Sequence, residues 1–429
     1  MTRPWFAIIA CVIGLGVIIQ PNSAQAGLED VLYEKGQLTK EEWIKAKADK
    51  EKATEEQDKK LDEKFPVTVS YGKKGLEFKT RDGKWLMNLR ARFQFRYSYG
   101  QDGNSLSAPS PTVFDDKAVS SFRVRRARLK IGGHGYQPWL KYYFEYDFPS
   151  TTLLDWRVDV AKYSWLQLRV GQWKIKYNRE RVDSSGKQQF VERSIVNLPF
   201  TLDRQIGAQL NGDLFQKTLA WLKWNVGVYT GTGINQKTND DKHMLWMGRL
   251  QWNFFGRDLP FSQSDVEYTE KPTGSLAVAA AHNRADRFIF PETSRPVGVV
   301  DGQFDINQAM AEVAFKWNGL SLQHEFHIKE VRNRTANGET VSLGAYAQAG
   351  YFPHALIDVI PRPLEFAYRF AFVDPNDTVR SVVLREHTVA ANWFFAGHNN
   401  KLTVDYSHLT RQGGFSPVDR VRLQWDVTF

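Results

Sequence analysis

Two early stretches of the chain carry Arg or Lys at alternate positions, namely Arg90, Arg92, Arg96, Arg126, Arg128 and Lys130. Successive side chains of a β-strand point to opposite faces, so residues at alternate positions share one face. Arginine also presents forked N–H donors that match the oxygens of phosphate and carboxylate groups. The spacing therefore predicts two strands that place positive charge on a common surface, where it can bind anions.

Alternation of apolar and polar side chains continues through most of the chain. The clear segments are 85–97, 140–148, 154–160, 166–170, 206–210, 220–228, 244–252, 311–317, 320–328, 341–351, 364–372, 387–395, 402–408 and 421–429, and weaker ones lie at 122–131 and 275–281. Such alternation is typical of strands with two unlike faces. It fits either a soluble sandwich, in which the apolar faces form a core, or a membrane barrel, in which they meet lipid.

Three properties favour the membrane barrel. The segments are long, about nine residues or more, as a tilted membrane strand requires. The polar faces carry many charges, which a soluble core would not tolerate unpaired. The 14 Trp, 16 Tyr and 28 Phe often lie near segment ends, where a barrel places its aromatic girdles. We expect an all-β fold, an antiparallel transmembrane β-barrel of about sixteen strands.

The strand pattern assigns the charged residues to the lumen. The further basic candidates are Lys141, Arg157, Arg169, Lys223, Arg249, Lys316, Lys329, Arg369, Lys401 and Arg422. The acidic ones are Glu145, Asp147, Asp155, Asp159, Glu312, Glu325, Glu365, Asp405 and Asp426. This basic excess predicts a preference for anions. The alternative is an unselective lumen whose arginines pair with wall carboxylates.

Signals for catalysis or metal binding are weak. HEFH (324–327) is one residue shorter than the zinc motif of helices, and in a strand its two histidines face opposite sides. GVYTGTG (227–233) lacks the lysine of a phosphate-binding loop, and no G-x-S-x-G occurs. Scattered Ser and His residues leave open a lipase-type site assembled in three dimensions. We expect no enzyme activity, no metal and no cofactor.

The N-terminal region has two parts. Residues 1–26 combine a cationic start, a short apolar run and Ala24-Gln25-Ala26, which predicts a signal peptide cleaved before Gly27. Its removal takes away Cys11, the only cysteine, and leaves 56 Lys and Arg against 48 Asp and Glu, a net charge of +8. Residues 27–66 are rich in Glu, Lys and Ala and predict a periplasmic helical segment before the barrel domain at 67–429. That segment is either a short coiled coil that assists trimer formation or a solvated single helix.

Several stretches together resemble one family, the phosphate- and polyphosphate-selective porins O and P. GLEFKTRDGKWLMNLRARFQF resembles the opening strand of the family, and VRRARLKIGGHGYQPWLKYYFEYDF its arginine-rich second strand and hairpin. LDWRVDVAKYSWLQLRVGQWKIKYNRERV and FVERSIVNLPFTLDRQIGAQLNG look like the stretch around its inward-folded third loop. GVYTGTGIN, HTVAANWFFAGHNNKLTVDYSHL and the terminal strand complete the series.

The resemblance implies a trimer of sixteen-stranded barrels in the bacterial outer membrane, with anions passing an arginine-lined constriction. The third loop corresponds to about 174–200 and places four cations near that constriction: Arg179, Arg181, Lys187 and Arg193. The sequence departs from the family at Lys176-Tyr177-Asn178, where a proline–aromatic pair is common. It departs also at Asp155-Trp156, where Asp-Ala is more usual.

The sequence thus predicts a passive outer-membrane pore for small anions, phosphate-like by resemblance, with no nucleic-acid partner. A general porin without selectivity and a structural barrel with a periplasmic helical tether are the alternatives. The last nine residues, VRLQWDVTF, alternate fully, and we expect this strand to close the barrel against the first. Its final aromatic, Phe429, resembles the signal that outer-membrane assembly machinery recognises.

Overall fold

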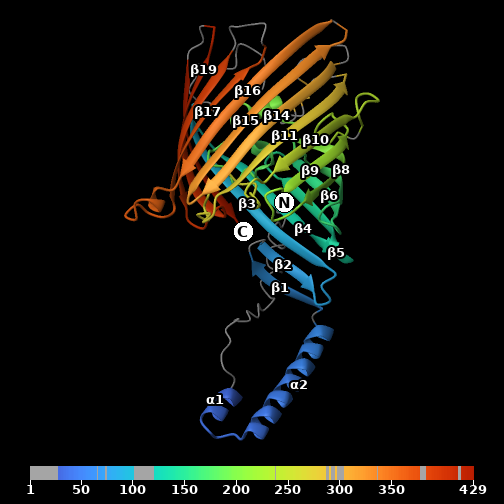
Figure 1. The fold of residues 1–429 in the computed structure, drawn as a ribbon, viewed down its shortest axis with the longest axis vertical. Helices are drawn as coiled ribbons and strands as arrows, with labels where there is room; N and C mark the ends of the chain where they lie inside the picture. Colours follow the sequence, from blue (N-terminus) through green and yellow to red (C-terminus); the bar gives the residue numbers. More distant parts are fainter. Residues whose placement is uncertain are drawn as a thin grey trace, which may run out of the picture. The chain divides into compact units, whose positions relative to one another are not determined.

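A computed structural model gives the fold of the chain (Figure 1). It describes residues 28–64, 66–72, 75–100, 120–236, 238–286, 289–290, 295–296, 304–335, 337–376, 383–413 and 417–429. The predicted signal peptide at 1–26 lies outside these residues. The chain divides into two compact units, Met1–Leu86 and Met87–Phe429.

The described residues of the first unit form two helices and a β-hairpin, with bounds α1 Leu28–Glu34, α2 Lys40–Lys64, β1 Val67–Gly72 and β2 Gly75–Thr80. Thr39 and Glu42 form a capping box at the start of α2, because the Glu42 N–H donates to Thr39 Oγ1 (3.3 Å) and the Thr39 N–H to Glu42 Oε2 (2.9 Å). The rings of Tyr33 and Trp43 stack at 5.0 Å and join α1 to α2. None of the described helices is long and apolar enough to cross a membrane.

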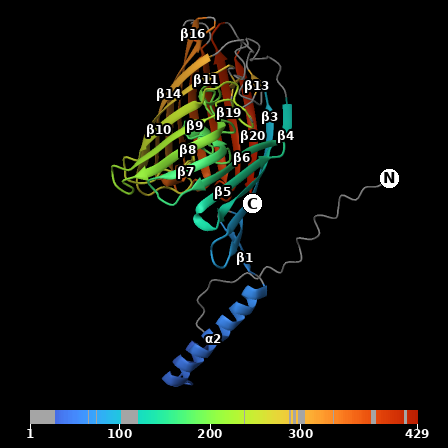
Figure 2. The same ribbon diagram turned by 90° about the vertical axis from the view of Figure 1, so that its right-hand side faces the viewer.

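The second unit contains a closed antiparallel β-barrel, which confirms the predicted fold class (Figures 1 and 2). The sixteen described wall strands are β3 Leu86–Tyr99, β4 Ser120–Gly135, β5 Gln137–Asp147, β6 Thr152–Val160, β7 Gln167–Lys174, β8 Arg204–Leu214, β9 Leu222–Tyr229, β10 Leu245–Trp252, β11 Thr273–Ala285, β14 Phe304–Trp317, β15 Leu320–Asn333, β16 Gly338–Tyr351, β17 Leu364–Asp374, β18 Leu384–Phe394, β19 Asn400–Arg411 and β20 Val418–Thr428. Each wall strand lies beside the next wall strand in the sequence. The connections carry the short elements α3 Arg179–Val182, α4 Asn197–Phe200, β12 Ile289–Phe290, β13 Arg295–Pro296 and the 3-10 helix η3 Pro353–Ala355.

The seam of the barrel joins β20 to β3. The two strands pair in antiparallel register from Val421 opposite Tyr99 to Thr428 opposite Arg92. Beyond the last paired residues, the Phe429 N–H donates to the Ala91 carbonyl (2.8 Å) and the Ala91 N–H donates to the Phe429 carbonyl (3.1 Å). The final strand thus leaves no open edge at the seam, where unpaired backbone groups would be costly in lipid.

The two faces of the wall follow the alternation of the sequence. On β20 the apolar Val421, Leu423 and Trp425 are exposed on the outside, whereas Arg422 and Gln424 are buried on the inside. Exposed aromatic side chains collect where strands end or turn at one end of the barrel, at Tyr136, Tyr163, Trp165, Phe215, Trp252, Trp317, Trp393, Phe395 and Phe429. We name this the lower end, where β3 begins and β20 ends; the opposite end is the upper end.

We expect substitutions on the outer face to act according to depth. Leu423→Arg, halfway along β20, should cost about 2–4 kcal/mol of unfolding free energy, because lipid at mid-membrane does not solvate the guanidinium. Val427→Arg lies on the same face next to the lower girdle and should cost only about 0–1 kcal/mol. Urea unfolding of the two variants in liposomes measures the difference, and equal costs would show that this face does not meet lipid.

Candidate functional site

The connection between β7 and β8, residues 175–203, enters the barrel from the upper end. Its side chains are almost all buried, including Glu180, Phe190, Val196 and Phe200, each 2% exposed or less. Four of its N–H groups reach wall carboxylates: Arg179 to Glu312 (2.8 Å), Glu180 to Glu325 (2.6 Å), Val191 to Asp405 (3.0 Å) and Ile195 to Glu386 (2.9 Å). Hydrogen bonds to ionised acceptors are stronger than neutral ones, so four strands hold the loop by its backbone. We call residues 175–203 the inner loop.

Glu192 gives the inner loop a further anchor on the arginine-rich strands. Its carboxylate lies 2.8 Å from Arg96, 3.0 Å from Arg125 and 3.4 Å from Arg126. Burial raises the pKa of Glu192, but the three guanidinium groups outweigh it and hold the pKa well below the usual value. Because the folded pKa is depressed, the stabilisation persists at neutral pH and is lost only as the pH falls through that low value.

The pKa of Glu180, inside the inner loop, is shifted in the opposite direction to that of Glu192. Burial raises its pKa to about 7, although Arg369 lowers it in part. Its carboxylate accepts hydrogen bonds from the N–H (2.6 Å) and the hydroxyl (2.8 Å) of Ser194. Between pH 4.5 and about 7 the folded chain therefore binds a proton that the unfolded chain releases, so rising pH weakens the contribution of this group to stability.

The cations predicted for the constriction mostly hold the loop together. Arg179 is fully buried, donates to the Pro260 carbonyl and lies 4.9 Å from the ring of Phe261. Arg181 donates from Nε to Asp203 (2.6 Å), and Arg193 donates to the carbonyls of Glu180 and Asp183, each at 2.9 Å. Of the four, Lys187 alone is exposed. Arg179, Arg181 and Arg193 thus bind groups of the protein itself, in contrast to the anion contact expected for them at the constriction.

A second connection, residues 253–272 between β10 and β11, enters from the lower end and meets the inner loop. The Gln263 N–H donates to the Lys187 carbonyl (3.0 Å), and the Gln189 N–H donates to Gln263 Oε1 (2.8 Å). Lys316 of the wall donates to Ser262 Oγ and to the Ser264 carbonyl, each at 2.7 Å. A connection from the lower end of the barrel therefore also reaches the lumen.

The two loops cover one side of the barrel interior and leave the other side accessible. Inner side chains of β17, β18 and β20 are buried from solvent: those of Arg369, Glu386 and Arg422 are each 0% exposed. On the opposite side, the side chains of Arg157 and Arg169 are 18% and 19% exposed. Open space inside the barrel therefore lies along β4 to β10.

Two cavities occupy this accessible side. The large inner cavity, of about 310 Å³, contains two acidic side chains, Glu145 and Asp155, and seven basic ones: Arg128, Lys130, Arg157, Arg169, Lys174, Lys176 and Arg204. The small inner cavity, of about 120 Å³, includes Lys176, Lys223 and Arg249 with one acid, Asp213. Both cavities carry an excess of positive charge.

Wall cations of the large inner cavity are paired with neighbouring acids. Arg128 lies 2.8 Å from Asp147, Arg157 lies 3.1 Å from Asp155, and Arg204 lies 2.6 Å from Asp155. These pairs fix the guanidinium groups in place. A guanidinium has five N–H donors, so it still has donors for an anion after it has bound a carboxylate.

Lys176 differs from these cations, because it makes no hydrogen bond or ion pair with the described part of the chain and it lines both cavities. Burial lowers its pKa to about 8, and the neighbouring Arg169, Lys223 and Arg249 act in the same direction. An unpaired ammonium at the point that the two cavities share is suited to bind a passing anion.

The positions predicted from sequence thus divide into two groups. Arg128, Lys130, Arg157 and Arg169 line the large inner cavity. By contrast, Arg92 donates to the hydroxyls of Ser184 (2.8 Å) and Ser185 (2.7 Å), Arg96 and Arg126 contact Glu192, and Arg90 donates to Asn399 Oδ1 (3.2 Å). The first three of these anchor the inner loop instead of facing open space.

Sequence reasoning missed Lys174, Lys176 and Arg204 as site residues. Lys174 and Arg204 are register partners at the ends of β7 and β8, where the chain leaves the wall, and Lys176 follows on the loop. Strand alternation no longer assigns a face at such positions. The available signal was the clustering of basic residues on both sides of a loop boundary. Within the described ranges, no group of three or more His, Cys, Asp or Glu is placed to hold a metal ion.

Comparisons with known proteins agree with this architecture. An anion-selective porin from Comamonas acidovorans is similar in structure, with a TM-score of 0.56 and 9% identity over 80% of this chain and 99% of that chain. The outer-membrane channel DcaP of Acinetobacter baumannii gives a TM-score of 0.53 and 13% identity over 82% and 99%. OmpT of Vibrio cholerae gives 0.54 and 6% over 81% and 98%. At these identities the likeness shows the fold alone.

Family membership comes from the sequence itself. No curated protein matches the chain. The model of a porin family, "Phosphate-selective porin O and P", matches residues 93–427, which span nearly the whole barrel. The chain therefore belongs to the phosphate-selective porin O and P family of outer-membrane channels.

Proposed function

We propose that this outer-membrane porin conducts small anions, phosphate-like in charge and shape, along the β4–β10 side of its lumen. The observation that carries the proposal is the charge of the large inner cavity, where seven basic side chains face two acidic ones. A cavity lined by one sign of charge and closed by low-dielectric walls concentrates counter-ions. The proposal includes no catalytic step.

Phosphate-like anions suit this lining for a geometric reason. Arg128, Arg157 and Arg204 are held by acids, so their forks are oriented before an anion arrives. Oriented guanidinium groups can replace part of the hydration of a phosphate oxygen, and weak binding at several sites lets the ion leave again. Acid partners also moderate the net charge, which keeps binding weak enough for conduction.

We further propose a role for the regions outside the pathway. The helical segment 27–66 is a periplasmic tether that assists assembly of a homotrimer; the mostly exposed surface of α2 suits a segment that acts outside the lumen. The exposed ring of Phe429 is the contact for outer-membrane assembly machinery. Deletion of 27–66, with trimer content read on native gels, tests the first role.

Reversal potentials in a KCl gradient across planar bilayers test the pore function. The proposal predicts anion preference and a reduction of chloride current by added phosphate, because both ions share the cationic cavities. Anion preference without phosphate block would support a general porin instead. Cation preference would overturn the proposal.

Lys176 should set much of the selectivity. Lys176→Gln should lower the anion-to-cation permeability ratio at pH 7 about fivefold, the effect of losing a charge interaction of about 1 kcal/mol. In the wild type the ratio should fall as the pH rises through about 8, because Lys176 then loses its proton. The variant should lack this step.

Lys187→Gln is the matched control for Lys176. Lys187 is on the same loop and exposed, but it lines neither cavity. It should leave the permeability ratio and its pH dependence unchanged. Equal effects of the two variants would contradict a special role for Lys176.

Glu192 should control whether the inner loop stays in place. Glu192→Gln leaves Arg96, Arg125 and Arg126 without their shared carboxylate, a change that costs about 3–5 kcal/mol for a buried pair. We expect larger and noisier single-channel currents, because the loop leaves the wall part of the time. Glu267→Gln, an exposed position on the 253–272 connection, is the control and should conduct like the wild type.

A further inference from the structure

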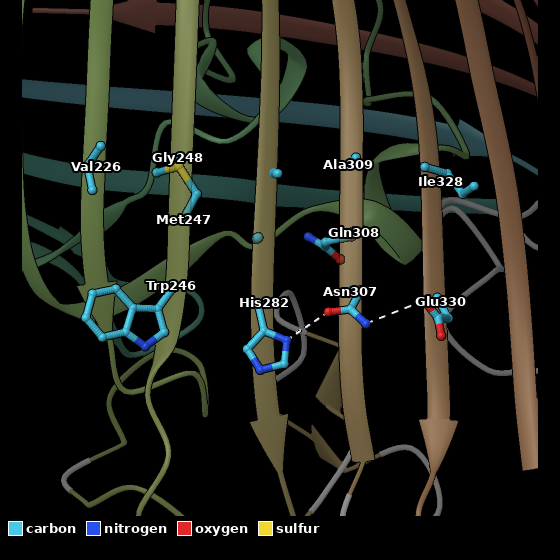
Figure 3. A pocket seen from close by; sticks show the side chains of 12 residues that line it. Val226, Trp246, Met247, Gly248, His282, Asn307, Gln308, Ala309, Ile328 and Glu330 are labelled. Atoms are coloured by element: carbon cyan, nitrogen blue, oxygen red, sulfur yellow. Dashed lines mark hydrogen bonds between the residues drawn. The ribbon is translucent and has the colours of Figure 1, made fainter.

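The outer face of the barrel has a groove near its upper end (Figure 3). Gly248, Ala280 and Ala309 are register neighbours on β10, β11 and β14 and form its floor. In the same row, Val226 of β9 and Ile328 of β15 rise at its two sides. The groove has a volume of about 610 Å³ and a mostly apolar lining. A methyl group added at Gly248 would meet no atom within 4 Å, so the floor is open to the outside.

A polar row closes the upper side of this groove. Figure 3 shows Trp246, His282, Asn307 and Glu330 side by side, one row nearer the upper end of the barrel than the floor; the upper end points downward in this view. His282 Nδ1 donates to Asn307 Oδ1 (2.8 Å), and Asn307 Nδ2 donates to Glu330 Oε2 (3.4 Å). These polar groups face the surroundings of the barrel, not its lumen. The neighbour that they meet must therefore offer polar groups at this level and apolar ones just below.

Charged side chains continue the polar row toward the upper end. Arg334 lies 2.7 Å from Asp305, and Arg332 lies 3.0 Å from Glu339. His282, Arg284, Arg332 and Arg334 share with Asp305 and Glu330 a depression that adjoins the groove. Arginine forks bind phosphate, whereas the carboxylates and Asn307 accept hydrogen bonds from hydroxyl groups. A ligand with both phosphate and sugar hydroxyls satisfies this mixture better than a simple anion.

We propose that the groove binds a phosphorylated glycolipid of the surrounding membrane, with an acyl chain on the Gly248–Ala280–Ala309 floor and its head group on the charged side chains above. The shape argues against a second barrel as the occupant. Barrel walls curve outward, so two copies touch ridge to ridge, and the exposed Trp246 and Ile328 would hold a flat partner off the floor. A single flexible chain can enter between them. This inference concerns the outer face and is independent of the proposed conduction.

Native mass spectrometry of the delipidated full-length protein tests the proposal. The probe is lipid A, an acylated and diphosphorylated glucosamine disaccharide; phosphatidylglycerol and dephosphorylated lipid A are the comparison lipids. Gly248→Leu adds a side chain on the floor, where an added Cβ meets no atom within 4 Å. It should weaken probe binding about tenfold, which corresponds to roughly two methylene groups kept out of the groove. Ala391→Leu, on the outer face of β18, is the matched control and should bind like the wild type.

The double variant Arg332→Gln with Arg334→Gln tests the head-group contacts separately from the contacts of the acyl chain. It should weaken binding of the probe but not of its dephosphorylated form. Unchanged conductance and heat-modifiable gel migration establish that each variant is folded. Wild-type affinity in Gly248→Leu, or equal affinity for phosphatidylglycerol, would overturn the proposal. Loss of oligomers in Gly248→Leu with lipid binding intact would also overturn it, because the groove would then be a contact between copies.

Discussion

The attachment of the inner loop to the barrel wall determines what the lumen can do. Backbone N–H groups of a loop cannot stay unpaired once water is excluded. Here carboxylates on β14, β15, β18 and β19 accept them, while Glu192 of the loop lies among guanidinium groups that include Arg96 of β3. Charges buried in this way are costly unless every partner is present. Each of these wall carboxylates therefore stabilises a particular part of the loop, and Glu325 binds both Asn178 and Glu180.

This attachment converts a wide barrel into a narrow asymmetric passage. The 253–272 connection supports the inner loop from below through Gln263, and both segments lie against the side formed by β14 to β20. The proposed anion pathway is the β4–β10 side, where seven basic and two acidic side chains line the large inner cavity. The same arginine chemistry thus serves two purposes: some guanidinium groups hold the loop, and others line the space that the loop leaves open.

Strand alternation predicted the barrel, its two faces and the closing role of VRLQWDVTF, because these depend on local period and on lipid. It also assigned Arg96 and Arg157 to the inner face. Strand alternation did not predict which of the two is accessible, because the inner loop, far away in sequence, covers Arg96 but not Arg157. Lys176 was missed as a site residue because its position depends on the path of that loop. Long-range packing, not local pattern, decides which inner charges meet the ion.

We propose that ions pass only along the β4–β10 side of the lumen. The predicted mature chain has no cysteine, so single cysteines can report accessibility from inside the pore. Asn211→Cys lies at the small inner cavity, and Thr388→Cys lies on the inner face of β18, at a fully buried position. A charged methanethiosulfonate reagent added during single-channel recording should reduce the current through Asn211→Cys and leave Thr388→Cys unchanged. Block of Thr388→Cys with no effect on Asn211→Cys would contradict the account.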